Sequence, residues 1–215
     1  MQKSRLVMLL AILIIMGCAT EKAEITRQAS MAQEKCDAPT YRIGDTWKYR
    51  TESGKFWSEK VAKIEDNLVY IEYIEGKHTR GLDAKTLQSK IEIDRSGVKR
   101  KIPESEALFY DFPLYVGKKW SKTIRGTTWP DDVNAFYLMD SRVIAFEEIT
   151  VPAGKFKTFK IEVVQSASGT TNSASVYFWY SPDVKQNIKV KFGTSYGPWR
   201  ITSIDYELFS YGLTP

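Results

Sequence analysis

Two pairs of adjacent carboxylates are the side chains best suited to act as a general acid and a general base. Asp131-Asp132 follows a Trp-Pro dipeptide, and Glu147-Glu148 lies in a stretch that favours a β-strand. A glycosidase needs two carboxyl groups roughly 5–10 Å apart. Neighbouring residues of a strand point to opposite faces, so Glu147 and Glu148 cannot form such a pair alone. A carbohydrate-active enzyme that uses Asp131 or Asp132 is therefore an alternative function, and a turn or Asx cap is the structural alternative.

Histidine and cysteine are too scarce for the common metal and nucleophilic sites. His78 is the single histidine, within EGKHTRG, and no second His or Cys lies at ligand spacing from it. A zinc site with His and Cys ligands is thus nearly excluded. The sequence has no G-x-S-x-G elbow, P-loop or dinucleotide fingerprint. We therefore expect no enzyme, no catalytic residue, no metal and no cofactor, and we expect His78 in an exposed turn.

Cys18 has the clearest chemical role in the sequence. It follows a positively charged start, with Lys3 and Arg5, and an uncharged apolar run over residues 6–16. This is the layout of a secretory signal peptide. The run is too short for a membrane-spanning helix, which takes about 20 residues. The small residue Gly17 and the thiol of Cys18 follow this run directly.

The segment Ile15-Met16-Gly17-Cys18 resembles the lipobox of bacterial lipoproteins. The resemblance implies cleavage between Gly17 and Cys18 and attachment of acyl chains such as palmitate at Cys18. The membrane is then a partner through a covalent lipid anchor, which is stable when two or more chains are attached. Ala19 in place of Asp implies the cell outer membrane of a Gram-negative host, with the protein facing the periplasm. An ordinary signal peptide with a chance cysteine is the alternative.

The remaining chain divides into a tether and one large domain. We predict a signal peptide over 1–17, a lipidated tether over 18–38 and an antiparallel β domain over 39–215, because the tether is polar and rich in Ala, Glu and Lys. Cys36 is the other cysteine, so no intramolecular disulfide can form once Cys18 carries lipid. Cys36 is then either a free thiol or a link to a partner, and of these we expect an exposed free thiol.

The charge of the chain is mild and scattered. The formal net charge is +5, and the densest basic run, over residues 99–101, holds three residues. Nucleic-acid binding would need a longer basic stripe. We therefore expect a solvated basic face and no nucleic-acid partner.

Alternating apolar and polar residues predict an all-β domain. Residues 68–75, 156–164, 174–181 and 201–211 are rich in β-branched and aromatic side chains. In 156–164 the alternation places Phe159, Ile161 and Val163 inward, and Thr158, Lys160 and Glu162 outward. One-sided burial of this kind is typical of antiparallel sheets in sandwiches and barrels. Residues 103–109 alone favour a short helix.

Two segments share the form aliphatic-Gly-x-x-Trp. They cover residues 43–47 and 116–120, and a tyrosine precedes each closely. In both, Gly can bend the chain and Trp can begin a strand and cover the core. Two related halves and a chance match are both open at this stage.

Two predicted strands are aromatic or apolar on both faces. Tyr70 and Tyr73 lie on opposite faces of 68–75, while Tyr177 and Trp179 share one face of 174–181. Such strands are either covered on both sides or line a cavity. We take these four residues as candidate binding residues for an acyl chain or another apolar ligand.

Three blocks resemble a family of bacterial envelope β proteins that carries a domain-of-unknown-function label. They are FPLYVGKKW at 112–120, VPAGKFKTFKIE at 151–162 and YFWYSPDVKQNIKVKF at 177–192. The resemblance implies a single domain built on a strongly curved antiparallel sheet, an open barrel or sandwich-like, and no assigned catalytic residues. This chain departs from the family pattern because the segment before VPAG is longer, through residues 127–140.

These observations favour an outer-membrane lipoprotein that binds an apolar ligand or handles lipid or lipoprotein. A structural or assembly protein that docks to another cell-envelope component is the first alternative. The carbohydrate-active enzyme is the second.

Overall fold

The computed structural model describes residues 34–102, 110–128, 133–167, 173–195 and 205–215. The chain divides into two units, Met1–Glu34 and Lys35–Pro215, and the strands among the described residues belong to the second unit. The predictions for the signal peptide, Cys18, most of the tether, the short helix over 103–109 and Asp131-Asp132 lie outside the described residues. None of the described helices is both long enough and apolar enough to span a membrane.

Antiparallel strands make up nearly all of the described secondary structure. In chain order the elements are β1 (Lys35–Cys36), β2 (Thr46–Thr51), β3 (Phe56–Glu65), β4 (Leu68–Tyr73), β5 (His78–Asp83), β6 (Ser89–Ile93), β7 (Lys99–Lys101), β8 (Leu114–Tyr115), β9 (Lys119–Thr128), β10 (Val133–Val151), β11 (Gly154–Ala167), β12 (Ser173–Ser181), the 3₁₀ helix η1 (Pro182–Val184), β13 (Gln186–Ser195) and β14 (Tyr206–Gly212).

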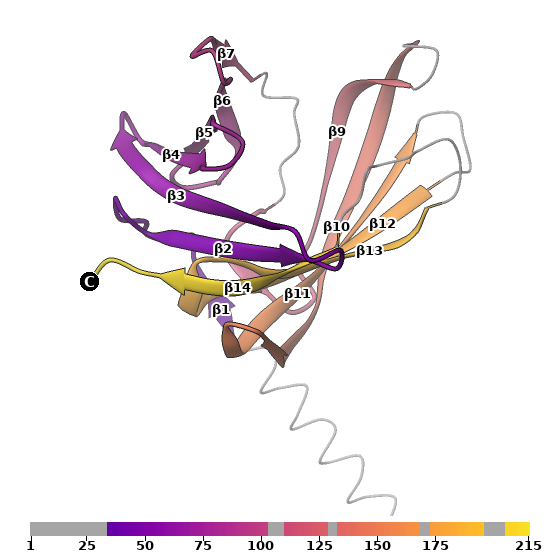
Figure 1. Cartoon of the computed structure of the whole chain (residues 1–215). Coiled ribbons are helices and arrows are strands. Elements are labelled where there is room, and N and C mark those ends of the chain that lie inside the picture. The colour runs from indigo at the N-terminus through magenta and orange to yellow at the C-terminus, as the bar shows by residue number, and fades with distance from the viewer. Residues whose placement is uncertain (1–33, 103–109, 129–132, 168–172, 196–204) are drawn as a thin grey trace, which may run out of the picture. The chain divides into compact units, whose positions relative to one another are not determined.

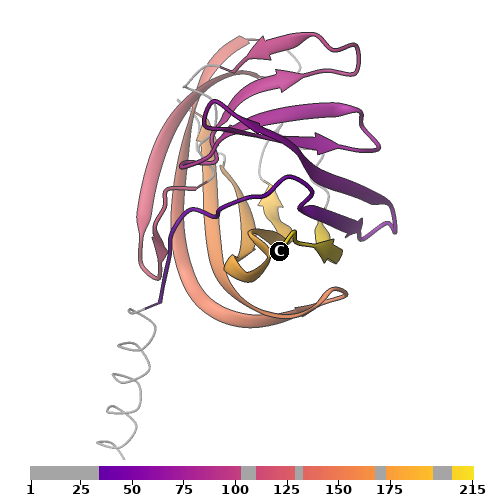
Figure 2. The ribbon, with the colours of Figure 1, turned by 90° about the vertical axis from the view of Figure 1, so that its left-hand side faces the viewer.

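One 12-stranded sheet dominates the domain. Its order is β7-β6-β5-β4-β3-β2-β14-β13-β12-β11-β10-β9, and β1 pairs with β8 in a separate two-stranded sheet. The large sheet thus consists of two meanders, β2–β7 and β9–β14, which join where β14 pairs with β2. The sheet is not closed, and β7 and β9 are its edges. Figures 1 and 2 show the β2–β7 strands on one side and the long, bent β9–β12 strands on the other. The predicted curved antiparallel fold is confirmed.

The two meanders begin with the same turn. Gly44 and Gly117 both have positive φ, +98° and +91°, which glycine adopts without strain. The Gly44 N–H donates to the Val61 carbonyl at 2.9 Å, and the Gly117 N–H donates to the Val143 carbonyl at 2.9 Å. The tryptophan of each segment is buried. Each of the two segments therefore forms a glycine turn at the start of a meander. Whether the two meanders are related halves stays a prediction.

The core combines side chains from both meanders. Phe159, Ile161 and Val163 are buried as predicted. The prediction of one-sided burial is wrong at Thr158, on the opposite face, because Thr158 is 0 % exposed and its hydroxyl donates to the Glu147 carbonyl of β10 at 3.0 Å. The largest fully buried side chains are Trp47, Tyr180, Phe159, Ile71, Leu114, Ile161, Ile188 and Leu208.

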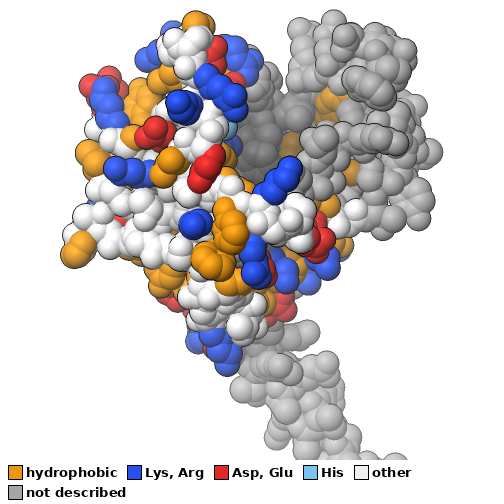
Figure 3. All heavy atoms as spheres, viewed as in Figure 1, with side chains coloured by type: hydrophobic (Ala, Val, Ile, Leu, Met, Phe, Trp, Pro, Cys, Tyr) orange, Lys and Arg blue, Asp and Glu red, His pale blue; other side chains and the backbone are white. Residues whose placement is uncertain are grey.

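The basic run predicted to be solvated forms an edge of the sheet. Residues Lys99–Lys101 are β7, and all three are exposed. Figure 3 shows Lys and Arg side chains gathered over this part of the molecule. Charged residues on an edge strand oppose pairing with another chain. This position gives the run a structural role.

Candidate functional site

A cavity of about 200 Å³ lies between side chains of the two meanders. Its walls are mostly aromatic and aliphatic, with a small number of polar groups among them. They are formed by Tyr41, Tyr49, Glu59, Ile71, Tyr73, Arg80, Leu82, Leu87, Ser89, Tyr110, Phe178, Gln186, Asn187 and Tyr206. Small-molecule sites generally combine an apolar lining with a few converging polar groups.

Strand register brings a charged residue into this cavity. Glu59 of β3 lies opposite Trp47 of β2 and Tyr73 of β4, and Tyr73 in turn lies opposite His78 of β5. Glu59 also shares a face of β3 with the buried Val61, since side chains alternate along a strand. The carboxylate therefore points to the core side of the sheet and is only 6 % exposed.

Glu59 and Arg80 form an ion pair at the wall of the cavity. Arg80 Nη2 lies 3.8 Å from Glu59 Oε1, and Arg80 also donates to the Tyr73 hydroxyl. The guanidinium centre is 4.8 Å from the Tyr73 ring centroid, within cation–π range. Burial raises the pKa of Glu59, and the charge of Arg80 and a hydrogen bond with Tyr73 offset this only in part. The pair therefore places two opposite, partly desolvated charges side by side.

Five tyrosines surround the ion pair. Burial, with the charge of Glu59 added, raises the pKa of each of them. They are Tyr41, Tyr49, Tyr73, Tyr110 and Tyr206. Their hydroxyls are consequently neutral at physiological pH, and their rings provide apolar surface while the hydroxyls remain able to hydrogen-bond.

His78 packs behind the cavity wall, against Tyr73, and does not lie in an exposed turn. It begins β5, is half-buried, and stacks on Tyr73 with ring centroids 4.3 Å apart. The prediction of an exposed turn residue is wrong, because cross-strand pairing with Tyr73 fixes the imidazole against that ring. His78 therefore helps to hold the Tyr73 ring in place.

Two residues that line the cavity each have a buried polar atom without a hydrogen-bond partner among the described residues. The two atoms are Arg80 Nε, a donor, and Asn187 Oδ1, an acceptor. The Asn187 side chain also hydrogen-bonds with the hydroxyls of Tyr110 and Tyr206. A buried polar group without a hydrogen-bond partner destabilises the folded state, so each such atom calls for an explanation. A ligand in the cavity could provide both missing partners.

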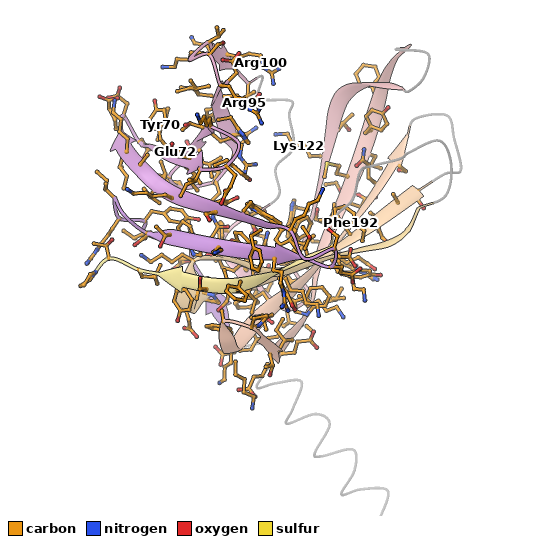
Figure 4. All side chains as sticks on the ribbon, in the orientation of Figure 1. Tyr70, Glu72, Arg95, Arg100, Lys122 and Phe192 are labelled. Carbon is orange, nitrogen blue, oxygen red and sulfur yellow. The ribbon has the colours of Figure 1, made fainter. Side chains whose placement is uncertain are left out.

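The structure does not bring the four predicted binding residues together. Tyr73 lines the cavity, whereas Tyr70 lies on the other face of β4, and Figure 4 shows it beside Glu72. A Cβ added at Gly81 would lie 3.3 Å from the Tyr70 ring, so Tyr70 covers this glycine of β5. Tyr70 thus has a packing role. Its predicted role in binding has no counterpart at this cavity.

Tyr177 and Trp179 also lie away from the cavity. Their ring centroids are 6.4 Å apart, and Phe178 between them points to the opposite face and lines the cavity. Lys160 Nζ lies 5.0 Å from the Trp179 ring centroid, and Trp179 Nε1 donates to Glu147 Oε1 at 2.8 Å. Side chains of the protein itself therefore already occupy the polar and cationic contacts of Trp179.

The remaining carboxylates considered in the sequence have separate partners. Glu147 binds Trp179, whereas Glu148 forms an ion pair with Lys155 at 2.6 Å. Asp131 and Asp132 lie outside the described residues. Across the described part of the chain, no three His, Cys, Asp or Glu residues are grouped so that they could hold a metal ion.

Cys36 is part of the folded unit. It pairs with Leu114 as part of β1, so within the described residues strand pairing includes Lys35 and Cys36, which the sequence analysis assigned to the tether. The prediction of an exposed thiol is wrong, because this pairing leaves Cys36 half-buried. Burial, with the nearby charge of Asp37, raises the pKa of the thiol to about 11. Cys36 therefore stays protonated, which makes it a poor nucleophile.

Comparisons with known proteins give structural neighbours only. No protein-family model matches the chain, and no curated protein matches it. The hypothetical lipoprotein YmcC from Escherichia coli K12 is similar with a TM-score of 0.45 and 11% identity, over 87% of this chain and 95% of that chain. A candidate lipoprotein from Parabacteroides distasonis gives a TM-score of 0.41 and 13% identity, over 84% and 100%.

A third neighbour is described as having a YmcC-like fold. It is a candidate exported protein from Bacteroides fragilis, with a TM-score of 0.37 and 10% identity over 82% of this chain and 99% of that chain. TM-scores and identities of this size carry no conclusion about the activity of this chain.

Proposed function

We propose that this chain is a non-catalytic lipoprotein of the outer membrane that faces the periplasm and binds a small ligand with an apolar body. The observation that carries the binding proposal is the tyrosine-lined cavity with Glu59 and Arg80 in its wall. Its volume of about 200 Å³ is below the ~300–1,000 Å³ typical of pockets for drug-sized ligands. The cavity therefore suits a short acyl segment or a single ring better than a complete lipid.

Binding fits the arrangement of the polar groups better than catalysis does. A buried carboxylate with a raised pKa can serve as a general base. In this cavity, however, Glu59 already interacts with Arg80 and Tyr73, which compete for the oxygens that would accept a substrate proton. We therefore assign these groups to orienting a ligand.

Native mass spectrometry of the mature domain tests the binding proposal. Protein purified from cells without detergent exchange should carry a small co-purified molecule. A Ser89→Phe variant, which places a ring in the cavity wall, should be ligand-free, whereas Ser210→Phe at an exposed serine of β14 should retain the molecule. Repeated ligand-free spectra of the wild type would contradict the proposal.

The anchoring proposal rests on Cys18 and its preceding lipobox-like residues. Cells grown with radioactive palmitate should label the wild-type protein. A variant should take up the label only if it keeps the thiol of Cys18. The matched pair is therefore Cys18→Ser, which should lose the label, and Cys36→Ser, which should keep it. Absence of label from the wild type, or label retained by Cys18→Ser, would contradict the anchor.

One surface observation favours a second candidate, the structural or assembly protein. Phe56 and Phe209 are 43 % and 38 % exposed and pack edge to face with ring centroids 5.0 Å apart. Lys48 Nζ lies 5.0 Å from the Phe56 centroid. Aromatic side chains are enriched in protein interfaces relative to the rest of the surface. Crosslinking in intact cells should then give one dominant envelope partner, and a Phe56→Ser/Phe209→Ser double variant should lose it.

A further inference from the structure

The charges in the cavity wall cancel. Among the residues that line the cavity, Glu59 and Arg80 are the charged side chains, and they are 3.8 Å apart. Tyr41, Tyr49 and the other lining tyrosines are neutral, as described above. A ligand that enters the cavity therefore meets a dipole with no net charge.

A charged ligand group would be disfavoured beside this pair. A carboxylate that approached Arg80 would also come close to the Glu59 carboxylate, and an ammonium that approached Glu59 would come close to the Arg80 guanidinium. Repulsion of this kind is stronger at a partly buried site, where water screens less. The ligand would also lose the hydration of its own charge, and it would find no unpaired opposite charge in the cavity to replace that hydration.

The two buried atoms without partners can be satisfied by hydrogen bonds from an uncharged group. Arg80 Nε lacks an acceptor and Asn187 Oδ1 lacks a donor among the described residues. A hydroxyl group can both accept and donate, and so can a primary amide. A purely apolar ligand would leave both atoms buried without partners, which costs binding free energy.

We propose that the ligand carries an uncharged, hydrogen-bonding group, a hydroxyl or a primary amide, next to its apolar body. This group binds near Glu59, Arg80 and Asn187, and the tyrosine rings hold the apolar body. The inference rests on the ligand binding proposed above and specifies the chemical class of the ligand.

Calorimetric titration of the folded domain with three probes of equal chain length tests the inference. The probes are 1-octanol, octanoate and octylamine at pH 7.5, where the last two are charged. We expect 1-octanol to bind roughly tenfold or more tightly than either charged probe, a difference of about 1.4 kcal/mol. Octanamide should behave as 1-octanol does.

Charge-removing variants give a second and reciprocal readout. Glu59→Gln leaves Arg80 without its carboxylate, so octanoate should gain affinity relative to 1-octanol. Arg80→Gln leaves Glu59 without its cation, so octylamine should gain. Glu148→Gln and Arg142→Gln are control substitutions at exposed, ion-paired residues of β10, and neither should change the preference.

The outcomes separate the inference from the proposed function. Saturable binding in which octanoate or octylamine equals or exceeds 1-octanol would overturn the inference and leave ligand binding in place. Failure of all the probes to bind the wild type would contradict both. The comparison of probes on the wild type requires no variant, so it stands even where a substitution in the ion pair unfolds the domain.

Discussion

The fully buried carboxylate of Asp45 accepts a hydrogen bond from the ammonium group of Lys185 at 2.9 Å. Its oxygens also accept from the backbone N–H groups of Thr214 at 2.8 Å and Arg42 at 3.0 Å. Lys185 follows η1 in the left-handed conformation, with φ of +60°. One side chain thereby joins the start of β2, the end of η1 and the last residues of the chain.

Replacement of Asp45 by Asn should strongly destabilise the domain. The change leaves Lys185 as a partly buried charge without its partner, and breaking such a pair costs about 3–5 kcal/mol. Urea unfolding measures the difference. The matched control is Asp183→Asn, an exposed aspartate of η1, where we expect a change within about 0.5 kcal/mol. Equal effects of the two substitutions would contradict the role of Asp45.

The contribution of Asp45 should depend on pH in the acid range. Burial by itself would raise its pKa, but the hydrogen bonds from Lys185, Thr214 and Arg42 outweigh burial and lower the pKa. The stabilisation is therefore complete above the unfolded pKa, about 3.9, and is lost as the pH falls through the lower folded pKa. The difference in unfolding free energy between wild type and Asp45→Asn should shrink in that range. A difference that stays constant down to the acid limit would contradict this assignment.

The pKa of Glu59 should be shifted in the opposite direction to that of Asp45. Its pKa is raised, chiefly by burial, so it should take up a proton above the usual value of about 4.3. At a pH between the unfolded pKa and the raised folded pKa of Glu59, the folded state binds more protons than the unfolded state. The free energy of unfolding should therefore fall as the pH rises through this range. Carboxyl carbon chemical shifts measured by NMR against pH give the titration directly. A Glu59 midpoint at or below the usual value would contradict the buried environment.

The two related turns give a matched pair of substitutions. Gly44→Ala and Gly117→Ala both place a Cβ on a residue with positive φ, which should cost about 1 kcal/mol or more each. At Gly44 the new Cβ would also lie 3.0 Å from Thr214 Oγ1, whereas nothing lies within 4 Å at Gly117. Thermal unfolding should therefore show a larger loss for Gly44→Ala. The reverse order would contradict the packing of the C-terminal residues on this turn.

Local sequence patterns predicted several of the strands. Alternation identified the segments that form β4, β11 and β12, and the VPAG turn lies between β10 and β11, where Val151 pairs with Gly154. Pro182 ends β12, as a residue without an N–H donor should. These features depend on neighbouring residues, so a single sequence carries them.

The candidate site could not be predicted in the same way. It depends on the register between β3, β4 and β5, which places Glu59 opposite Tyr73 and brings Arg80 to the same wall. The pairing of β14 with β2 joins residues from opposite ends of the chain, and no local pattern specifies it. A weak signal was present, since Trp57, Glu59 and Val61 alternate on one face of a strand. A charged residue at such a position indicates either an outward face or a functional site.

Trp179 shows why aromatic strands are ambiguous. Its ring is buried against Lys160, and Glu147 accepts its N–H, so its polar and apolar parts are both satisfied within the protein. The sequence shows an aromatic residue on each face of β12, but it does not show which face the long lysine side chains cover. Of Tyr177, Phe178 and Trp179, only Phe178, on the opposite face of β12, lines the cavity.

The most direct test of the account is an NMR titration of the ¹⁵N-labelled domain with 1-octanol. We predict saturable amide shifts centred on Glu59, Arg80 and Asn187, and we predict that Ser89→Phe abolishes them while Ser210→Phe leaves them unchanged. Shifts centred on Phe56 and Phe209, or no saturable shifts in the wild type, would contradict ligand binding in the cavity.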